Sequence, residues 1–318
     1  MTITFASGLS FLGGFTVTAA LPPPSENTAA WFGGGSFPAR STVDRITYAT
    51  DTATASVRGP LSLARYYLAA VGNFDYGWFG GGYTPGAALS TVDRITYATD
   101  TATASVRGPL SLARYGLAAA GNTTDGWFGA GYDAGSKSTV DRITYATDTA
   151  TASVRGPLSL ARRYFAATGN TDYGWFGGGA SPVYSTVDRI TYATDTATAS
   201  VRGPLSSARY LLAAAGNTTD GWFGGGSISD VARSTVDRIT YATDTATASV
   251  RGPLSSGRSY LAAAGNTTDG WFGGGNSSFN SPSSTVQRIT YATDTATASV
   301  RGLLSLARKN LAAAGGIQ

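Results

Sequence analysis

The sequence predicts an all-β protein, a six-bladed β-propeller with four-stranded blades. Three observations lead to this prediction. The nineteen residues STVDRITYATDTATASVRG begin at Ser41 and recur five times, and the last copy has Gln287 in place of an aspartate. The six tryptophans recur every 47 to 49 residues, a period typical of a blade of four short strands. Glycine and Thr-Asp turn signals interrupt each unit about every ten residues, which is the spacing of strands.

Four stretches of one unit, between residues 65 and 110, have the composition of strands. In order they are RYYLAAVG, WFGGG, STVDRITYA and ASVRG. The alanine-rich first stretch suits the crowded axis of a ring. Each Trp-Phe pair should hold neighbouring blades together, because an aromatic side chain buries about 150–250 Å². In the TDTAT turn we expect Asp100 or Thr101 to bond its own backbone, and Pro109 lies outside the strands because it cannot donate to a ladder.

This order of residues resembles the kelch repeat. In this chain the repeat reads ARYYLAAVGNFDYGWFGGG, then a loop, then STVDRITYATDTATASVRGPL, and the resemblance covers residues 31–318 six times over. The resemblance implies a β-propeller whose first strand lies nearest the axis. Kelch repeats usually carry a tryptophan in the fourth strand. Here Ala55, Ala104 and their equivalents take that place, and the large aromatic residues are in the second strand instead.

The chain divides into an apolar, proline-rich arm (residues 1–30) and a propeller (residues 31–318). The first unit starts at its second strand, whereas the last unit ends after a first strand. We therefore expect residues 308–315 to pair beside residues 31–35, because this closes the ring and removes two exposed sheet edges. Residues 15–22 are an alternative closing strand, but prolines follow them and they match the other first strands less well.

Composition excludes several kinds of chemistry. The chain has no cysteine and no histidine, which excludes disulfides, thiolate chemistry, Cys/His zinc sites and imidazole catalysis. A net charge of +4 is too small to predict a nucleic-acid partner, and no apolar run is long enough for a membrane span. Glu26 lies outside the repeats, and the variable loops offer only Asp133 and Asp230, two repeats apart. We therefore expect a non-enzymatic protein without a cofactor or metal.

The six copies differ mainly in two places. The loops between second and third strands read SFPAR, YTPGAAL, YDAGSK, ASPVY, SISDVAR and NSSFNSPS, and the two residues after the Arg of each first strand also change. Both places should lie on one face, because alternate connections of an antiparallel blade emerge together. Surface loops tolerate change without any function, but neutral drift would also alter the equally exposed turns between first and second strands. The pattern favours a recognition face.

Two residue sets are candidates for binding on that face. The loop aromatics suit adaptable contacts and the apolar faces of sugars, since an aromatic ring gives contact area at low entropic cost. They are Phe37, Tyr83, Tyr132, Tyr184 and Phe279. An arginine that opens each first strand could ring the channel mouth and attract an anion. These arginines are Arg65, Arg114, Arg162, Arg209, Arg258 and Arg308. The alternative is that they pair with the repeated aspartates of the Asp44 and Asp51 series, which are numerous enough to favour pairing.

The arm carries apolar residues and no charge before Glu26. Its candidate anchor residues are Phe5, Leu9, Phe11, Leu12 and Phe15. Such residues suit a groove on a protein partner, where each can contribute about 1.5–3 kcal/mol. We expect a structural or recognition protein on a particle surface, such as a phage virion, with the arm as anchor and the loops outward. The alternatives are an intracellular, cytoplasmic kelch-type adaptor that binds a peptide, and a lectin-like propeller that binds glycans.

Overall fold

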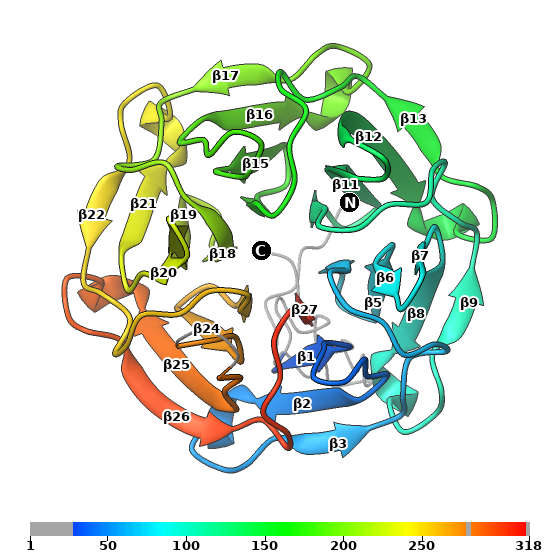
Figure 1. Cartoon of the computed structure of the whole chain (residues 1–318), viewed down its shortest axis with the longest axis horizontal. Coiled ribbons are helices and arrows are strands. Elements are labelled where there is room, and N and C mark those ends of the chain that lie inside the picture. The colour runs from blue at the N-terminus through cyan, green and yellow to red at the C-terminus, as the bar shows by residue number, and fades with distance from the viewer. Residues whose placement is uncertain (1–27, 278–280, 316–318) are drawn as a thin grey trace, which may run out of the picture.

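The computed structural model is a closed ring of six antiparallel sheets around a central axis (Figure 1). It describes residues 28–277 and 281–315. The predicted six-bladed β-propeller is confirmed, and helix in the described residues is limited to one 3₁₀ turn of three residues in each blade. These turns are η1 (Tyr48–Thr50), η2 (Tyr97–Thr99), η3 (Tyr145–Thr147), η4 (Tyr192–Thr194), η5 (Tyr241–Thr243) and η6 (Tyr291–Thr293). No helix in the described part of the chain is long and apolar enough to span a membrane.

Each blade has four strands, which are called first to fourth from the axis outward. In each list below, the strands are given for blades 1 to 6 in turn. The innermost strands are β27 (Ala312–Gly315), β4 (Ala69–Gly72), β10 (Ala118–Gly121), β14 (Ala166–Gly169), β18 (Tyr210–Gly216) and β23 (Ala262–Gly265). The second strands are β1 (Ala29–Gly33), β5 (Tyr76–Gly80), β11 (Asp125–Tyr132), β15 (Tyr173–Gly177), β19 (Asp220–Ile228) and β24 (Asp269–Gly273).

The outer half of each blade is made by the sequence that hardly varies. The third strands are β2 (Val43–Thr47), β8 (Val92–Thr96), β12 (Ser136–Thr144), β16 (Val187–Thr191), β21 (Val236–Thr240) and β25 (Thr285–Thr290). The fourth strands are β3 (Ser56–Arg58), β9 (Ser105–Arg107), β13 (Ser153–Arg155), β17 (Ser200–Arg202), β22 (Ser249–Arg251) and β26 (Ser299–Leu303). Three short strands extend the loops: β6 (Tyr83–Thr84), β7 (Ala87–Ala88) and β20 (Val231–Ala232).

In blade 2 the first and third strands are shorter than the sequence predicts. Strand β4 begins at Ala69, because Tyr67 just before it has a φ of 57°, which ends extended pairing. Strand β8 ends at Thr96, where the chain turns into η2. The second strand lies two residues earlier than predicted, at Tyr76–Gly80, because Gly81 and Gly82 have positive φ values. Ala70, Phe79, Asp93 and Val106 lie in one register across the four strands of blade 2.

Aromatic residues join each blade to the next. The indole of Trp31 in blade 1 stacks on Tyr97 of blade 2, with ring centroids 3.7 Å apart. Phe79 of blade 2 lies against Gly33 of blade 1, where a Cβ atom would be only 2.7 Å from the ring. The same two contacts recur at the other five seams. The expectation that Trp and Phe hold the blades together is therefore confirmed.

The C-terminal strand closes the ring. Strand β27 pairs with β1, with Ala314 opposite Trp31 and Ala313 opposite Phe32. This confirms the predicted closure, and the alternative segment at residues 15–22 lies outside the described residues. Ala30 and Gly315 pair at the position where the other five blades have a turn between first and second strands. The chain therefore joins and leaves the propeller at the same face.

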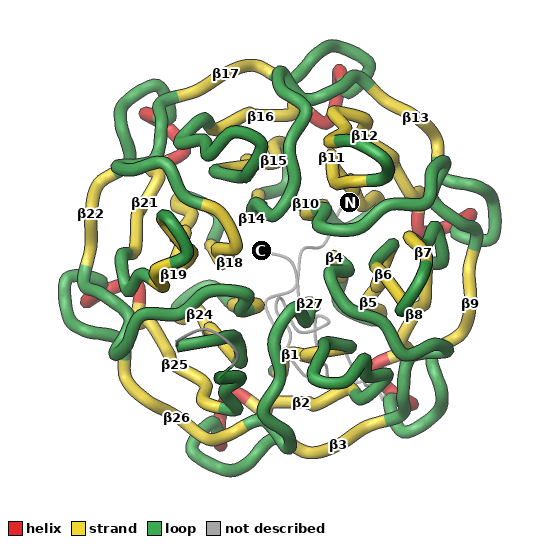
Figure 2. The backbone as a smooth tube through the Cα atoms, in the orientation of Figure 1, coloured by secondary structure: helices red, strands yellow, loops and turns green. Residues whose placement is uncertain are grey.

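The two faces of the ring differ in their connections. We call the face with the turns between first and second strands, together with the 3₁₀ turns, the turn face. We call the opposite face the loop face, because it carries the loops between second and third strands and the links between blades. Figure 2 shows these links as green tubes that pass from the outer strands toward the centre. The variable sequence lies on the loop face, and both ends of the described chain lie on the turn face.

Candidate ligand-binding face

The six arginines that open the first strands lie inside the blades and do not line the channel mouth. Their exposed fractions are between 0 and 5%. In blade 2, Arg65 lies 3.2 Å from the carboxylate of Asp93 and donates a 2.9 Å hydrogen bond to the carbonyl of Phe79. Four other blades repeat the ion pair. Side chains that are this deeply buried are unavailable to a surface ligand, so the pairing alternative describes them correctly.

Blade 6 departs from this pattern because Gln287 stands where the other blades have an aspartate. Its amide oxygen accepts hydrogen bonds from the backbone and hydroxyl of Ser255, as Asp141 does from Ser111. Burial lowers the pKa of Arg258, and no carboxylate opposes that effect, in contrast to Arg65 and its equivalents. The amide thus keeps the serine contacts of the aspartate and lacks its charge.

The second aspartate series also has a structural role. The sequence predicts that Asp100 or Thr101 bonds its own backbone. Instead, the carboxylate of Asp100 accepts a 2.8 Å hydrogen bond from the indole N–H of Trp31. Arg45 and Arg58 of blade 1 approach the same oxygen, at 3.1 and 3.5 Å. Each of the other five seams contains the same Trp–Asp bond. The Arg45 and Arg58 series therefore join neighbouring blades, and the Arg65 series stabilises each blade internally.

The variable segments of each blade meet on the loop face. The first variable residue after the buried arginine pairs with a residue at the start of the loop between second and third strands. In blades 2 and 3 these pairs are Tyr66 with Tyr83 and Tyr115 with Tyr132, and in blade 4 Arg163 pairs with Ala180. Blades 5, 6 and 1 have the pairs Tyr210–Ser227, Ser259–Asn276 and Lys309–Ser36. The aromatic pairs therefore lie side by side in blades 2 and 3, and the face is not six-fold symmetric.

Seven tyrosines form one continuous group on the loop face, which we call the tyrosine cluster. Its members are Tyr66, Tyr67, Tyr83, Tyr115, Tyr132, Tyr164 and Tyr260. Tyr115 is central to the group, with its ring centroid 5.0 Å from that of Tyr83, 5.4 Å from Tyr132 and 5.8 Å from Tyr67. All seven side chains are partly exposed. Burial raises the pKa of Tyr67 and Tyr164 well above the ordinary value, so both phenols are neutral at physiological pH.

A ring of backbone hydrogen bonds surrounds the axis at this face. The second variable residue of each blade donates its N–H to the carbonyl of its counterpart in the preceding blade, at 2.7 to 2.9 Å. The six residues are Tyr67, Gly116, Tyr164, Leu211, Tyr260 and Asn310, and all have left-handed φ values of 57 to 66°. Gly116 also makes room for Tyr164, since a Cβ atom there would lie 2.8 Å from the ring. These hydrogen bonds fix the backbone of Tyr67, Tyr164 and Tyr260.

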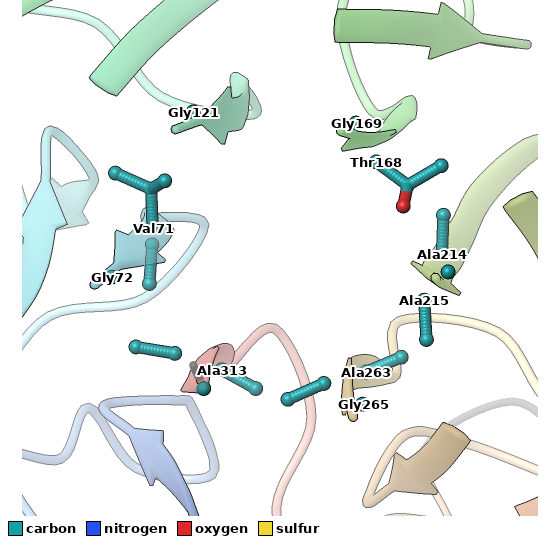
Figure 3. A pocket seen from close by; sticks show the side chains of 15 residues that line it. Val71, Gly72, Gly121, Thr168, Gly169, Ala214, Ala215, Ala263, Gly265 and Ala313 are labelled. Carbon is teal, nitrogen blue, oxygen red and sulfur yellow. The ribbon is translucent and has the colours of Figure 1, made fainter. Parts of the chain in front are cut away.

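The axial channel offers little space for chemistry. Tyr67, Tyr164 and Tyr260 come from alternate blades and meet over the axis, and the cavity beneath them has a volume of about 60 Å³. At the turn face the channel contains a cavity of about 100 Å³ lined by Gly, Ala, Val71 and Thr168 (Figure 3). No group of three or more potential metal-ligating side chains occurs in residues 28–277 and 281–315. The accessible functional groups of the loop face are therefore those of its surface.

Two of the other predicted binding residues are described, Phe37 and Tyr184, and neither makes a ring contact with the cluster. Phe37 is 56% exposed, and the ammonium of Lys309 lies 5.9 Å from the centre of its ring. The hydroxyl of Tyr184 donates to the carbonyl of Ser181 within its own loop. Phe279 lies outside the described residues, as do the five candidate anchors of the arm, Phe5, Leu9, Phe11, Leu12 and Phe15.

Of the predicted loop aromatics that the structure describes, only Tyr83 and Tyr132 belong to the cluster. The other five cluster tyrosines follow the buried arginines and were not among the predicted site residues. The signal was present, because these positions vary between copies while the rest of the first strand hardly changes. What the sequence could not show is that this segment lies beside the start of the following loop.

Comparison with known proteins adds no assignment: no family model matches the chain, and no curated protein matches it.

Proposed function

We propose that the protein is a non-enzymatic recognition module that is anchored at its turn face and binds a ligand at its loop face. The observation that carries this proposal is that the ends of the described chain and the variable residues lie on opposite faces of the ring. The described chain begins and ends at the turn face, whereas the variable segments and the tyrosine cluster lie on the loop face. A constant frame with one variable face is the arrangement that a binding scaffold requires.

Within the β-propeller class, we propose that the blades are kelch-like. The support is the order of residues in each blade, with a small apolar inner strand, an aromatic second strand that ends in glycines, and a Tyr and Asp at the outer turn. In this chain the aromatic contacts between blades come from the second strand, at Trp31 and Phe32 and their equivalents, rather than from the fourth strand.

The proposed setting is the surface of a particle such as a phage virion. The described chain begins at Thr28 on the turn face, so an arm that binds the particle would direct the loop face outward. The apolar composition of the arm supports a protein groove as its partner. An intracellular adaptor remains the alternative. It would use the same loop face for a peptide and would not need the arm for assembly.

Deletion of residues 1–24 tests the anchor. We expect the shortened chain to fold, because every described strand remains, and to fail to join the native particle. A matched control, Tyr184→Ser, changes one loop residue and should join the particle normally. Assembly of the shortened chain at the level of the full chain would contradict the proposal, and would point to the turn face of the propeller itself as the anchor.

The proposal also includes the absence of catalysis. The exposed carboxylates of the variable loops are Asp133 in blade 3 and Asp230 in blade 5, and Asp230 accepts a hydrogen bond from Tyr210. A screen with hydrolase and oxidase substrates should therefore give no turnover. Turnover that is abolished by Asp133→Asn would overturn this part of the proposal.

A further inference from the structure

We propose that the tyrosine cluster binds an acidic oligosaccharide, with sugar rings against the tyrosines and a carboxylate or sulfate group of the sugar beside Arg163. This inference rests on the proposed function, because it takes the loop face as the recognition face. Three features of that face support it: the distribution of charge, the position of Arg163, and the shape of the aromatic surface.

The charge distribution is the first feature. Three arginines in each of six repeats account for eighteen of the 23 basic residues. Arginines of this set form the ion pairs that hold the frame together. The remaining five, all on the loop face, are Arg40, Lys137, Arg163, Arg233 and Lys309.

The acidic residues outside the repeated series have the opposite distribution. Five of them lie at the turn face, between first and second strands, namely Asp75, Asp125, Asp172, Asp220 and Asp269. Among the described acidic residues outside the repeated series, only Asp133 and Asp230 lie on the loop face. Three of the turn-face aspartates, Asp125, Asp220 and Asp269, are paired with repeated arginines. On the loop face, five non-repeated basic residues face only two acidic ones, so these residues make it basic. A basic surface attracts anionic ligands and raises their rate of encounter.

Arg163 connects this charge to the tyrosines. Its guanidinium lies 4.3 Å from the ring centre of Tyr132 and 5.4 Å from that of Tyr164. The rings hold the planar group in place without neutralising it, because a cation over an aromatic face keeps its charge. A guanidinium can donate two parallel hydrogen bonds to a carboxylate or a sulfate. At the other side of the cluster, the ammonium of Lys309 lies 5.3 Å from the ring centre of Tyr260.

The shape of the site favours a sugar over an acidic peptide. The cluster is a broad surface of partly exposed phenols, and the cavity in its centre has a volume of only about 60 Å³. A peptide ligand usually places an anchor side chain in a deeper pocket. Tyrosine has an apolar ring and a polar hydroxyl, so a surface of tyrosines can contact both the C–H face and the hydroxyl groups of a sugar. The hydrogen-bonded ring around the axis keeps this surface rigid, which lowers the entropic cost of binding.

The test measures binding of the full chain to defined hexamers by calorimetry. The probes are oligogalacturonate and a chondroitin sulfate fragment as acidic sugars, maltohexaose and cellohexaose as neutral sugars, and hexaglutamate as an acidic peptide. We expect at least one acidic sugar to bind ten or more times as tightly as either neutral sugar or the peptide, and its affinity to fall as salt is added. Chondroitin sulfate carries carboxylates as well as sulfates, so the matched unsulfated chondroitin fragment distinguishes the two groups: binding lost with the sulfates assigns a sulfate ligand, and unchanged binding assigns a carboxylate ligand.

Two variants and two matched controls locate the site. Arg163→Gln should reduce the affinity for the acidic sugar to that for the neutral ones, and Tyr115→Ala should weaken both by tenfold or more. The controls, Arg233→Gln and Tyr210→Ala, change a loop-face arginine and a loop-face tyrosine in blade 5, outside the cluster. Tyr210→Ala should bind like the unaltered chain, and Arg233→Gln, which removes one loop-face charge but no contact within the cluster, should lose far less affinity than Arg163→Gln. Thermal melting of all four variants confirms that each is folded.

Several results would overturn the inference. They are equal affinity for acidic and neutral sugars, equal affinity for hexaglutamate, absence of binding to any sugar, or an equal loss in the control variants. These failures can be distinguished from failure of the proposed function. A chain that joins the particle through its arm but binds none of these sugars would refute the acidic sugar as ligand and leave the anchor role intact.

Discussion

Each blade of this propeller buries an arginine, and in five of the six its partner is an aspartate. Burial alone would strongly disfavour either charge, but Arg65 and Asp93 are both fully buried and neutralise each other at 3.2 Å. The arginine also donates to the carbonyl of Phe79, and Asp93 accepts from the backbone of Ser62. One ion pair thus joins the link before the first strand to the second and third strands. This explains why these residues hardly vary while their neighbours Tyr66 and Tyr67 have different counterparts in other blades.

Removal of one charge of the pair should be costly. We expect Asp93→Asn to lower the free energy of unfolding by about 3–5 kcal/mol, because Arg65 would remain buried without a counter-charge. Asp75→Asn, at an exposed turn, is the matched control and should change stability by less than about 0.5 kcal/mol. Urea unfolding followed by tryptophan fluorescence measures both. Similar stability of the two variants would show that the buried pair is dispensable.

At the scale of the element, the seam between blades is the repeated unit of stability. It contains the stacked Trp31 and Tyr97, the bond from Trp31 to Asp100, and the close approach of Gly59 to blade 2. A Cβ atom at Gly59 would lie 1.9 Å from the carbonyl oxygen of Ala102. At every seam, therefore, the glycine of the repeated sequence VRG leaves space for the backbone of the next blade. Its equivalents are Gly108, Gly156, Gly203, Gly252 and Gly302.

The substitution Gly59→Ala should force blades 1 and 2 apart. We expect it to lower the free energy of unfolding by at least about 3 kcal/mol, since the obstructing atom belongs to the backbone and cannot rotate away. Gly86→Ala adds the same methyl group at a position where no atom lies within 4 Å, so it should cost only the strain of its φ of 118°, about 1–3 kcal/mol, and destabilise less than Gly59→Ala. Equal melting temperatures of the two variants would refute the tight seam.

The seam tyrosines also predict a dependence of stability on alkaline pH. Burial raises the pKa of Tyr97, Tyr145 and Tyr192 well above the ordinary value near 10. Above pH ~10 the unfolded chain loses these phenol protons and the folded chain keeps them, so unfolding releases protons and stability falls as pH rises. Stability should be fully present below pH ~10.

Urea unfolding at pH 8 and pH 11 measures this effect. The midpoint should fall at pH 11, and phenolate absorbance from the stacked tyrosines should appear only on unfolding. The variant Tyr97→Phe retains a ring for Trp31 and should show a smaller fall. A midpoint that does not change between the two pH values would contradict the raised pKa values.

At the scale of the whole molecule, closure by the C-terminal strand is the central structural feature. Strand β27 supplies the innermost strand of blade 1, so the first and last parts of the described chain form one sheet. The closed ring leaves no seam between blades open, and each blade is held on both sides. Tandem repetition alone would have left an open edge at each end.

Truncation after residue 306 tests closure. It removes β27 and leaves Trp31 and Phe32 without their partners, so we expect aggregation or a large fall in melting temperature. Truncation after residue 315 is the matched control and leaves every described strand intact. A chain without residues 307–318 that melts like the full chain would show that another segment takes the place of β27.

The sequence predicted the frame better than the site, for a physical reason. Six copies show directly which residues the frame requires, such as Trp31 and its equivalents, and the offset of the copies predicted closure. The role of Arg65 stayed open because pairing and exposure are equally compatible with its spacing. The tyrosine cluster depends on contacts between blades and between two variable segments, such as Tyr67 with Tyr164 and Tyr115 with Tyr132. Periodicity carries no information on such contacts.

Electron cryo-microscopy of particles from the native source would test the central claim most directly, because it shows which face of the ring is anchored. The account predicts that the turn face, where Ala30 and Gly315 pair, lies against the particle and that the tyrosine cluster points outward. Density that places the loop face against the particle, with the turn face exposed, would contradict it.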